Sequence, residues 1–354
     1  MNRNGITLRA ATLLITLLIV LPLVWIRLPH VAGGGGASGE IQPADLSQLN
    51  LAWGVEWIAA PKAWERTTGS DSIVVAVIDS GVDTSVPQLA GKIWTNADEI
   101  PGNGIDDDAN GYIDDVHGWD FRDNDPSSLV GSKIHWHGTF VAGIIAAQPN
   151  ADRATGVAPG IHVMDLRFLD SKNLFYSRDW ARFAEAIDYA VYNGAQIINL
   201  SVYANGTPPA VLERALCRAA QLGVIVVGIA GNDSHSRVCY PAKYPSVLAV
   251  SATDRNDRLA SFSNYGAEVA VSAPGEKITS LFSGGITGTS SGTSFSAPHV
   301  SGTLALILSA HPGLTPDGAI DLLRQTSVDL GDNGQDSRFG AGLIDAGQAV
   351  ASTS

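Results

Sequence analysis

Short runs of consecutive apolar residues recur along the chain, each bounded by small or polar residues. The clearest is Ile73-Val-Val-Ala-Val-Ile78, in which β-branched residues dominate and neither face of a strand would be polar. Such runs are typical of parallel strands that are buried on both faces. Comparable runs, which predict further strands of the same sheet, occur at residues 161–168, 195–200, 224–229 and 247–250.

Stretches with helical character lie between or after these runs, at residues 138–147, 179–192, 208–222, 295–310 and 315–325. Pro316 stands near the start of the last stretch, where a missing N–H group costs least. The alternation of strands and helices predicts an α/β fold, a three-layer sandwich with a mostly parallel central sheet. Ligands of such sheets bind beyond the carboxyl ends of the strands, so the chemistry is expected there.

The N-terminal segment has the pattern of a targeting sequence. Arg3 and Arg9 precede an uncharged apolar run at residues 10–26, and small residues follow at 32–39. This pattern predicts either a secretory signal peptide that is cleaved after Ala37 or an uncleaved membrane anchor.

Both alternatives imply the same domain organisation and place the remaining chain outside the cytoplasm. Residues 1–37 would be the signal or anchor, 38–50 a linker with glycine, serine and proline, and 51–354 a single folded domain. The expected location is therefore secreted, periplasmic, or anchored to the outer face of the cytoplasmic membrane.

Charge and cysteine content narrow the partners. The 354 residues carry a formal net charge of -13, which argues against a nucleic-acid partner and against attraction to anionic lipids. The only cysteines are Cys217 and Cys239, which either form one disulfide, as suits an exported protein, or remain free thiols. No Cys/His cluster with zinc-ligand spacing is present in the sequence.

Three polar residues stand where predicted strands end or predicted helices begin. Asp79 directly follows the run at 73–78, and His137 and Ser294 each lie at the start of a helical stretch. Each alone has an ordinary explanation, as a turn residue or a helix cap. Together they supply what a serine nucleophile needs: a base that removes its proton and a third group that holds the base in the right tautomer.

In this order and in these contexts, the chain resembles the subtilisin-like serine peptidases. The matching segments, which span roughly residues 51–350, are Val77-Ile-Asp79-Ser-Gly-Val82, His137-Gly-Thr with Val141-Ala-Gly143, Asn199-Leu-Ser201, Ala230-Gly-Asn232, Ser261-Phe-Ser-Asn-Tyr-Gly266, Ala273-Pro-Gly275, and Gly292-Thr-Ser294 through Pro298-His299. The resemblance implies a serine endopeptidase that hydrolyses proteins or peptides through an acyl-enzyme, with no cofactor for catalysis.

The resemblance also implies roles for individual residues. Asp79, His137 and Ser294 would form the catalytic triad, and the side-chain amide of Asn232 would complete an oxyanion hole. The residues expected to bind substrate are Ser201, Val202 and Tyr203, as an edge that pairs with the substrate backbone, and Gly228 and Gly231, as a wall of the specificity pocket.

Two other histidines need to be separated from the base. His135 precedes His137 by two positions, but Gly-Thr follows only His137, as the family motif requires. His299 matches a family position beside a proline that is structural, so we expect no catalytic role for it.

Four departures from the family pattern surround the expected site. Trp136 stands where glycine is usual, Phe140 replaces a second histidine, Tyr203-Ala204 replaces a Gly-Gly pair, and Phe295 replaces methionine. None removes a catalytic group. We expect Trp136 to narrow the cleft and Tyr203 to crowd the substrate subsites, favouring small or unusual residues.

A further departure concerns folding. Exported members of the family normally carry a prodomain between the signal and the catalytic domain, and residues 40–50 offer no room for one. The resulting hypothesis is that the protein folds unaided or with the help of a partner.

The most acidic stretch of the chain resembles a calcium loop. Asp106, Asp108, Asn110 and Asp114 supply oxygen ligands, and glycine occupies the sixth position of the loop. The twelfth position holds His117 in place of the usual glutamate, so the match is partial. Structural calcium and a solvated acidic turn both remain open, and acidic calcium loops are common in the family.

Two other functions compete with peptidase activity. A surface-anchored pseudo-peptidase that only binds peptides or partner proteins stays open because of Trp136, Tyr203 and the missing prodomain. A lipase-like hydrolase is disfavoured, because Ser294 lacks a Gly-x-Ser-x-Gly elbow and that fold places its histidine last.

Overall fold

The computed structural model describes residues 51–126, 134–149 and 154–352, all of which fall within one compact unit of the chain. The predicted signal or anchor at 1–37 and the linker at 38–50 lie outside the described residues. Within the described ranges, no helix combines the length and the hydrophobicity needed to cross a membrane.

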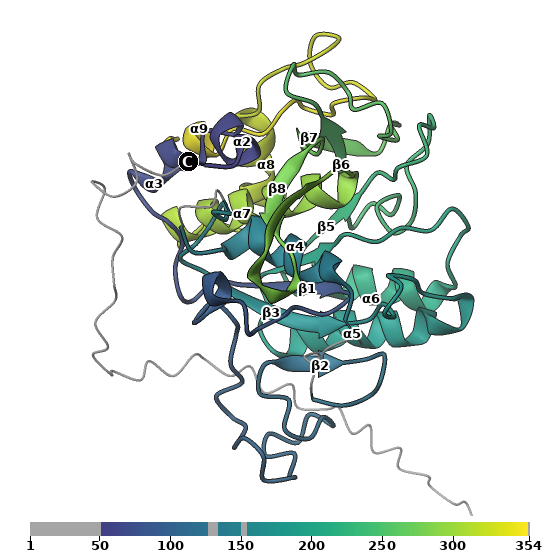
Figure 1. Ribbon diagram of the computed structural model, residues 1–354. Coiled ribbons are helices and arrows are strands. Elements are labelled where there is room, and N and C mark those ends of the chain that lie inside the picture. The colour runs from purple at the N-terminus through teal and green to yellow at the C-terminus, as the bar shows by residue number, and fades with distance from the viewer. Residues whose placement is uncertain (1–50, 127–133, 150–153, 353–354) are drawn as a thin grey trace, which may run out of the picture. The chain divides into compact units, whose positions relative to one another are not determined.

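A seven-stranded sheet forms the centre of the fold (Figure 1), in the order β2-β3-β1-β4-β5-β6-β7. Every neighbouring pair is parallel. The strands are β1 (Val74–Asp79), β2 (Gly118–Asp120), β3 (His162–Arg167), β4 (Ile197–Leu200), β5 (Ile225–Ile229), β6 (Leu248–Thr253) and β7 (Val269–Pro274). A separate antiparallel pair consists of β8 (Ile278–Leu281) and β9 (Thr287–Ser290).

The two faces of the sheet are covered by different helices. Successive side chains of a strand point to opposite faces, so Val75 and Val77 of β1 join one hydrophobic cluster while Ala76 and Ile78 join another. The first cluster includes residues of α2 (Trp53–Trp57), α3 (Ala60–Trp64), α4 (Trp136–Ala146), α7 (Thr293–Ala310), α8 (Pro316–Gln325) and α9 (Ala346–Ala351). The second includes residues of α5 (Trp180–Tyr192) and α6 (Ala210–Gln221), which lie together in Figure 1. The predicted three-layer α/β sandwich is confirmed.

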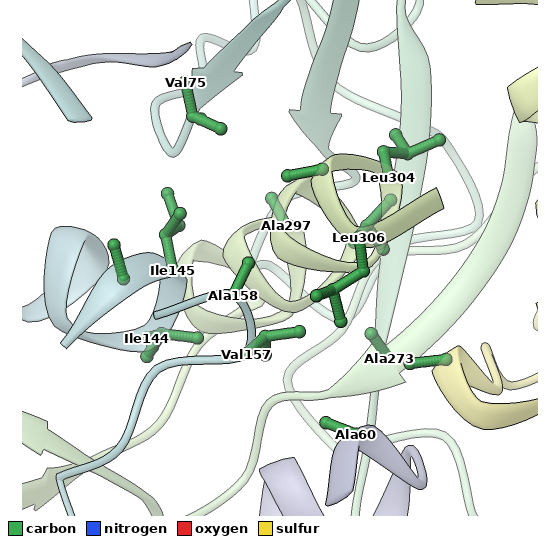
Figure 2. Close-up of a cluster of buried hydrophobic side chains, with 14 of the residues drawn as sticks. Ala60, Val75, Ile144, Ile145, Val157, Ala158, Ala273, Ala297, Leu304 and Leu306 are labelled. Atoms are coloured by element: carbon green, nitrogen blue, oxygen red, sulfur yellow. The ribbon is translucent and has the colours of Figure 1, made fainter. Parts of the chain in front are cut away.

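Helix α7 lies in the middle of the first cluster. Its residues 293–307 are all buried, including small polar ones such as Ser296 and Ser301, so no face of this part of the helix is exposed. Figure 2 shows part of this cluster, in which Ile144 and Ile145 of α4 lie near α7. The position of α7 matters for function because its first turn carries Ser294.

The five predicted strands and five predicted helices are all present, with ends that differ by a few residues. The sequence did not indicate the short strand β2, the strands β7 to β9, or the short helices α2, α3 and α9. The alternative of a disulfide is not realised, because Cys217 and Cys239 are both free thiols.

Candidate active site

The sheet topology brings three chain segments to one edge. Strands β1, β4 and β5 are adjacent and parallel, so their carboxyl ends lie side by side. Asp79 ends β1, Ser201 follows β4, and Asn232 lies just beyond β5. The first turns of α4 and α7 add His137 and Ser294 from one face of the sheet.

Asp79 and His137 form a buried pair. The Nδ1 atom of His137 lies 2.8 Å from Oδ1 and 3.0 Å from Oδ2 of Asp79, and both side chains are buried. The backbone N–H of Ser80 also donates to Oδ1, at 2.7 Å. A carboxylate can only accept, so Nδ1 of His137 carries the proton and Nε2 is free to take one from a nucleophile.

The first turn of α4 is fixed to the turn that follows Asp79. The hydroxyl of Ser80 accepts from the N–H of Gly138 and donates to the carbonyl of His135, both at 2.9 Å. A Cβ atom at Gly138 would lie 2.4 Å from the carbonyl oxygen of Gly81, so only glycine permits this approach. The ring Nδ1 of His135 accepts from the N–H of His137 at 3.3 Å and caps the helix. His135 is therefore a structural neighbour of the Asp79–His137 pair.

The hydroxyl of Ser294 is the third part of the predicted triad. It donates to the carbonyl of Ser201 at 3.3 Å, and its residue is 8% exposed. Among the hydrogen bonds of the described residues, none joins Ser294 to His137, although both side chains line the same cleft. Contacts between nucleophile and base are often long in proteins without substrate and tighten when substrate binds.

A proline inside α7 ties the helix to strand β4. Pro298 has no N–H, so the carbonyl of Ser294 four residues earlier has no helical partner. The hydroxyl of Ser201 donates to that carbonyl at 2.8 Å, and the amide of Asn199 donates to the Ser201 hydroxyl at 2.9 Å. Asn199 in turn accepts from the hydroxyl of Ser301 at 2.9 Å. The end of β4 and the start of α7 are therefore held in a fixed relation.

The side chain of Asn232 is oriented by the residue before Ser294. Its Oδ1 atom accepts from both the N–H and the hydroxyl of Thr293, each at 2.8 Å. The Nδ2 group is thereby left to donate elsewhere, and a Cβ atom at Gly292 would lie 3.7 Å from it. Asn232 can therefore offer a donor beside Ser294, on the wall of the cleft.

The cleft has a volume of about 810 Å³ and is lined by most of the residues predicted to bind substrate. Ser201, Val202 and Tyr203 lie on its wall. Gly228 and Gly231 do not line this cleft. A Cβ atom at Gly228 would contact Ala242 and Val247, and one at Gly231 would contact Cys239 and Asn264.

Three of the four departures from the family pattern pack together beside His137. The ring centroid of Phe295 lies 5.5 Å from that of His137 and 4.6 Å from that of Phe140. The Trp136 centroid lies 5.8 Å from that of His137 and 4.6 Å from that of Phe282. Trp136 is half-buried and lines the cleft, and narrowing of the cleft by its ring stays a prediction. Phe282, from a segment outside any predicted element, was not foreseen.

The acidic stretch contains one compact cluster of carboxylates. Oxygen atoms of Glu99, Asp106 and Asp108 all lie within 4.8 Å of one another. Glu99 was not among the predicted ligands, because it precedes the loop motif. Asp114 instead accepts from the N–H groups of Asn103 and Gly104, each at 3.0 Å.

Asn110, the remaining predicted ligand, uses both ends of its side-chain amide in hydrogen bonds, and its Oδ1 atom accepts from the N–H of Tyr112 at 2.8 Å. The amide nitrogen of Asn110 donates to Asp108 at 3.0 Å and to Asp115 at 2.9 Å. Burial, together with neighbouring carboxylates, raises the pKa values of Glu99 and Asp108. Three clustered carboxylates fit the oxygen ligands that calcium prefers.

His299 is buried behind the site. Its Nδ1 atom donates to the carbonyl of Phe295 at 2.6 Å, and burial lowers its pKa to about 4. A Cβ atom at Gly54 of α2 would lie 2.5 Å from its Nε2 atom. These contacts give His299 a place in the packing between α2 and α7.

The sequence is similar to those of known proteins over most of its length. The sequence model of the Subtilase family (Peptidase_S8) matches residues 70–342. The thermostable alkaline protease of Halalkalibacterium halodurans is 35% identical over 300 residues, which cover 85% of this chain and 73% of that protein. The thermophilic serine proteinase of Bacillus sp. is 38% identical over 268 residues, covering 75% and 60%. Subtilisin Savinase of Lederbergia lenta is 32% identical over 301 residues, covering 85% and 99%.

Proposed function

This chain belongs to the subtilase family and is a serine endopeptidase, and from that premise we propose that Asp79, His137 and Ser294 are its catalytic triad. The observation that carries the assignment is the buried Asp79–His137 pair, which shares one cleft with the Ser294 hydroxyl. A pseudo-peptidase would have no need to keep a buried carboxylate aligned on the imidazole.

The geometry supports an acyl-transfer mechanism. Nε2 of His137 takes the proton of the Ser294 hydroxyl as the oxygen attacks the scissile carbonyl, and Asp79 stabilises the imidazolium that forms. The oxyanion of the tetrahedral intermediate accepts from the Nδ2 group of Asn232 and from the backbone N–H of Ser294. His137 then protonates the leaving amine. In the second half of the reaction, water attacks the acyl-enzyme while His137 accepts its proton, and His137 returns that proton to the Ser294 oxygen as the acid product leaves.

Cleavage of a peptide library by wild type and by Ser294→Ala tests the assignment. We expect the variant to lose activity by several orders of magnitude and to lose labelling by a fluorophosphonate probe. Ser291→Ala is a matched control, because Ser291 also lines the cleft but accepts from the N–H of Lys277. Equal cleavage by wild type and Ser294→Ala would contradict the mechanism, and an unlabelled wild type would favour the pseudo-peptidase.

The substrates are proteins or peptides that bind in extended form. We assign Ser201, Val202 and Tyr203 as the edge that pairs with the substrate backbone. Gly228 and Gly231 would support the neighbouring wall from behind, since each is closely packed against other residues.

We keep export as a proposal that rests on residues 1–37. Cell fractionation with N-terminal sequencing tests it. A mature chain that begins after Ala37 supports a cleaved signal, and an intact chain in the membrane fraction supports an anchor. A full-length chain in the cytoplasm would contradict both.

We also propose that Glu99, Asp106 and Asp108 hold a structural calcium ion. Bound calcium would neutralise carboxylates that lie within 4.8 Å of one another and hold the loop in place. The melting temperature should therefore fall when a chelator is added, and Asp106→Asn should abolish most of that response. Asp114→Asn is the matched control, because the Asp114 side chain accepts from the N–H groups of Asn103 and Gly104 and is not one of the three clustered carboxylates. No shift with chelator would count against the site.

A further inference from the structure

Two chain segments form facing walls beside Asn232. One follows β4 at residues 201–204, and the other runs from the end of β5 to Asp233. The strands are adjacent and parallel, so the segments face one another. The scissile carbonyl lies between Ser294 and Asn232 in the proposed mechanism. We expect the side chain on the amino side of that bond to enter the gap between these walls, because Tyr203 and Asn232, one from each wall, line the same cleft as Ser294.

The side chain of Tyr203 crosses this gap. It starts on the first wall, and its hydroxyl donates to Oδ1 of Asp233 on the second wall at 3.3 Å. The ring is half-buried and packs against the hydrophobic cluster that contains α4 and α7. The Gly-Gly pair that is usual in the family would leave this space open.

The backbone at this point is held firmly. The N–H of Ala204 donates to the carbonyl of Tyr240 at 2.8 Å, and the N–H of Tyr240 donates back at 3.1 Å. This two-way pairing joins the first wall to the segment that follows Asn232. The Tyr203 ring can therefore leave the gap only by rotating its side chain and breaking the bond to Asp233.

The polar side chains next to Tyr203 and Asp233 form hydrogen bonds with one another. The thiol of Cys239 donates to Oδ1 of Asn205 and accepts from Nδ2 of Asn264, both at 3.2 Å. Oδ1 of Asn264 accepts from the N–H of Asp233 at 2.9 Å. Correspondingly, Tyr203 and Asn232 line the cleft, whereas Gly231 is covered by Cys239 and Asn264.

The surroundings of the Tyr203 hydroxyl favour its protonated form. Burial and the neighbouring Asp233 carboxylate raise the pKa of the Tyr203 hydroxyl above its ordinary value. The raised pKa favours the protonated phenol, which is the form that can donate this hydrogen bond.

We propose that Tyr203 acts as a stopper in the specificity pocket and, held by Asp233, restricts the residue on the amino side of the scissile bond to small side chains such as glycine, alanine or serine. The inference rests on the proposed function and adds the substrate class to it. Shortening the pocket acts on binding of one side chain and leaves the proton transfers at Ser294 and His137 unchanged.

The test uses peptides that differ only in the residue before the scissile bond, which is alanine or phenylalanine. Fluorophosphonate titration of Ser294 first gives the concentration of active enzyme. We expect wild type to have at least tenfold higher kcat/KM for the alanine peptide. Tyr203→Gly should raise kcat/KM for the phenylalanine peptide by tenfold or more. The reason is that removal of the Tyr203 side chain makes room in the pocket for the larger substrate side chain. The ratio of kcat/KM for the phenylalanine peptide to that for the alanine peptide should rise by the same tenfold or more, and this ratio is the readout, because a change in backbone binding at residue 203 affects both peptides alike.

Two further variants separate ring volume from the hydrogen bond and from folding defects. Tyr203→Phe keeps the ring and loses the bond to Asp233, so its gain with the phenylalanine peptide should be smaller than that of Tyr203→Gly. Tyr203→Ala, which adds less backbone freedom than glycine, should reproduce the Tyr203→Gly result if opening of the pocket is the cause.

The outcomes that overturn the stopper differ from those that overturn the function. Two outcomes would refute the role of Tyr203 as a stopper and leave the catalytic assignment intact. In the first, wild type is labelled by the fluorophosphonate but prefers the phenylalanine peptide. In the second, Tyr203→Gly and Tyr203→Ala are both labelled but keep the wild-type preference. Wild type that is neither labelled nor able to cleave either peptide would refute the catalytic assignment and the stopper with it.

Discussion

Two histidines begin helix α4, and their surroundings assign them different tasks. His137 faces the carboxylate of Asp79, whereas His135 accepts from a backbone N–H as the helix cap. Burial, and next the neighbouring His137, lower the pKa of His135, so it is poorly suited to carry charge. We expect His137→Ala to lower kcat by roughly 10⁵-fold or more, because the base is lost.

For His135→Ala we expect kcat within a few-fold of wild type and a loss of about 1 kcal/mol in the free energy of unfolding. His135→Asn, which retains a capping group, should recover most of that stability. Steady-state kinetics and urea unfolding measure both effects. If His135→Ala were inactive while fully folded, the division of roles between the two histidines would be wrong.

The orientation of Asn232 depends on Thr293, so the two residues allow a graded prediction. Asn232→Asp keeps the acceptor bonded to Thr293 but replaces the donor with a repelling oxygen. We expect kcat to fall by about 10²- to 10³-fold with little change in KM, since the interaction forms only in the transition state. Thr293→Val removes one of two bonds to the amide, and its loss should be smaller. A large rise in KM with unchanged kcat would instead place Asn232 in substrate binding.

At the scale of single residues, the sequence predicts the role of a residue that lies in a recognisable motif. It does not predict contacts between residues that only folding brings together. Asp79, His137 and Ser294 were found from their order and their neighbours along the chain. Glu99 was missed because it joins Asp106 and Asp108 only through the path of the loop. The network around Tyr203 was likewise invisible, because Asp233 lies 30 positions away.

At the scale of elements, patterns of burial explain which segments could be predicted. Strand β1 is buried on both faces over its whole length, and its apolar run was conspicuous. Strand β2 has only three residues, too few to form a pattern. Strand β7 reads VAVSAP, so serine and proline disguise a segment that is entirely buried. Helices α2 and α3 have five residues each, too few for a pattern. They are specified by burial of Trp53 and Val55 of α2, and of Ala60 and Trp64 of α3, in the first hydrophobic cluster.

The packing of α2 on α7 makes the stability of this unit pH-dependent. Burial lowers the pKa of His299 from 6.5 to about 4. Between those two values the unfolded chain binds the proton and the folded chain does not, so stability is lost as the pH falls. The contribution amounts to roughly 3 kcal/mol when the whole window is crossed.

Urea unfolding at pH 7 and at pH 4.5 measures this effect. Buried Asp165, whose pKa is raised by desolvation, acts in the opposite direction, so the comparison requires a variant. We expect His299→Gln to lose less free energy of unfolding than wild type between pH 7 and pH 4.5, or to gain more, because only the destabilising contribution is removed. Identical slopes for the two proteins would show that His299 does not titrate as its burial implies.

At the scale of the whole described structure, the sheet separates two hydrophobic clusters while the cleft draws on both. His137 and Ser294 belong to helices on one face. The opposite wall of the cleft includes Leu169, Tyr176 and Trp180, next to the face covered by α5 and α6. Binding of substrate therefore requires that the elements on the two faces keep their relative positions at the carboxyl edge of the sheet.

Arg122, just after β2, secures that wall from outside the cleft. Its guanidinium donates to the carbonyl of Phe168 at 2.9 and 3.1 Å and to Asp179 at 3.0 Å. Asp179 in turn accepts from the N–H of Tyr176 at 2.8 Å. A charged group that bonds both ends of one wall holds its backbone without touching the reacting atoms.

Replacement of Arg122 by alanine should therefore loosen substrate binding and leave the chemistry intact. We expect KM for a peptide substrate to rise about three- to tenfold with kcat within twofold, because the wall binds substrate equally in ground and transition states. Arg218→Ala is the matched control. Arg218 pairs with Asp188 at 2.5 Å on the exposed surface, where such pairs contribute at most about 1 kcal/mol, so its KM should not change. Equal KM values for Arg122→Ala and wild type, with both proteins folded, would mean that the wall keeps its shape without Arg122.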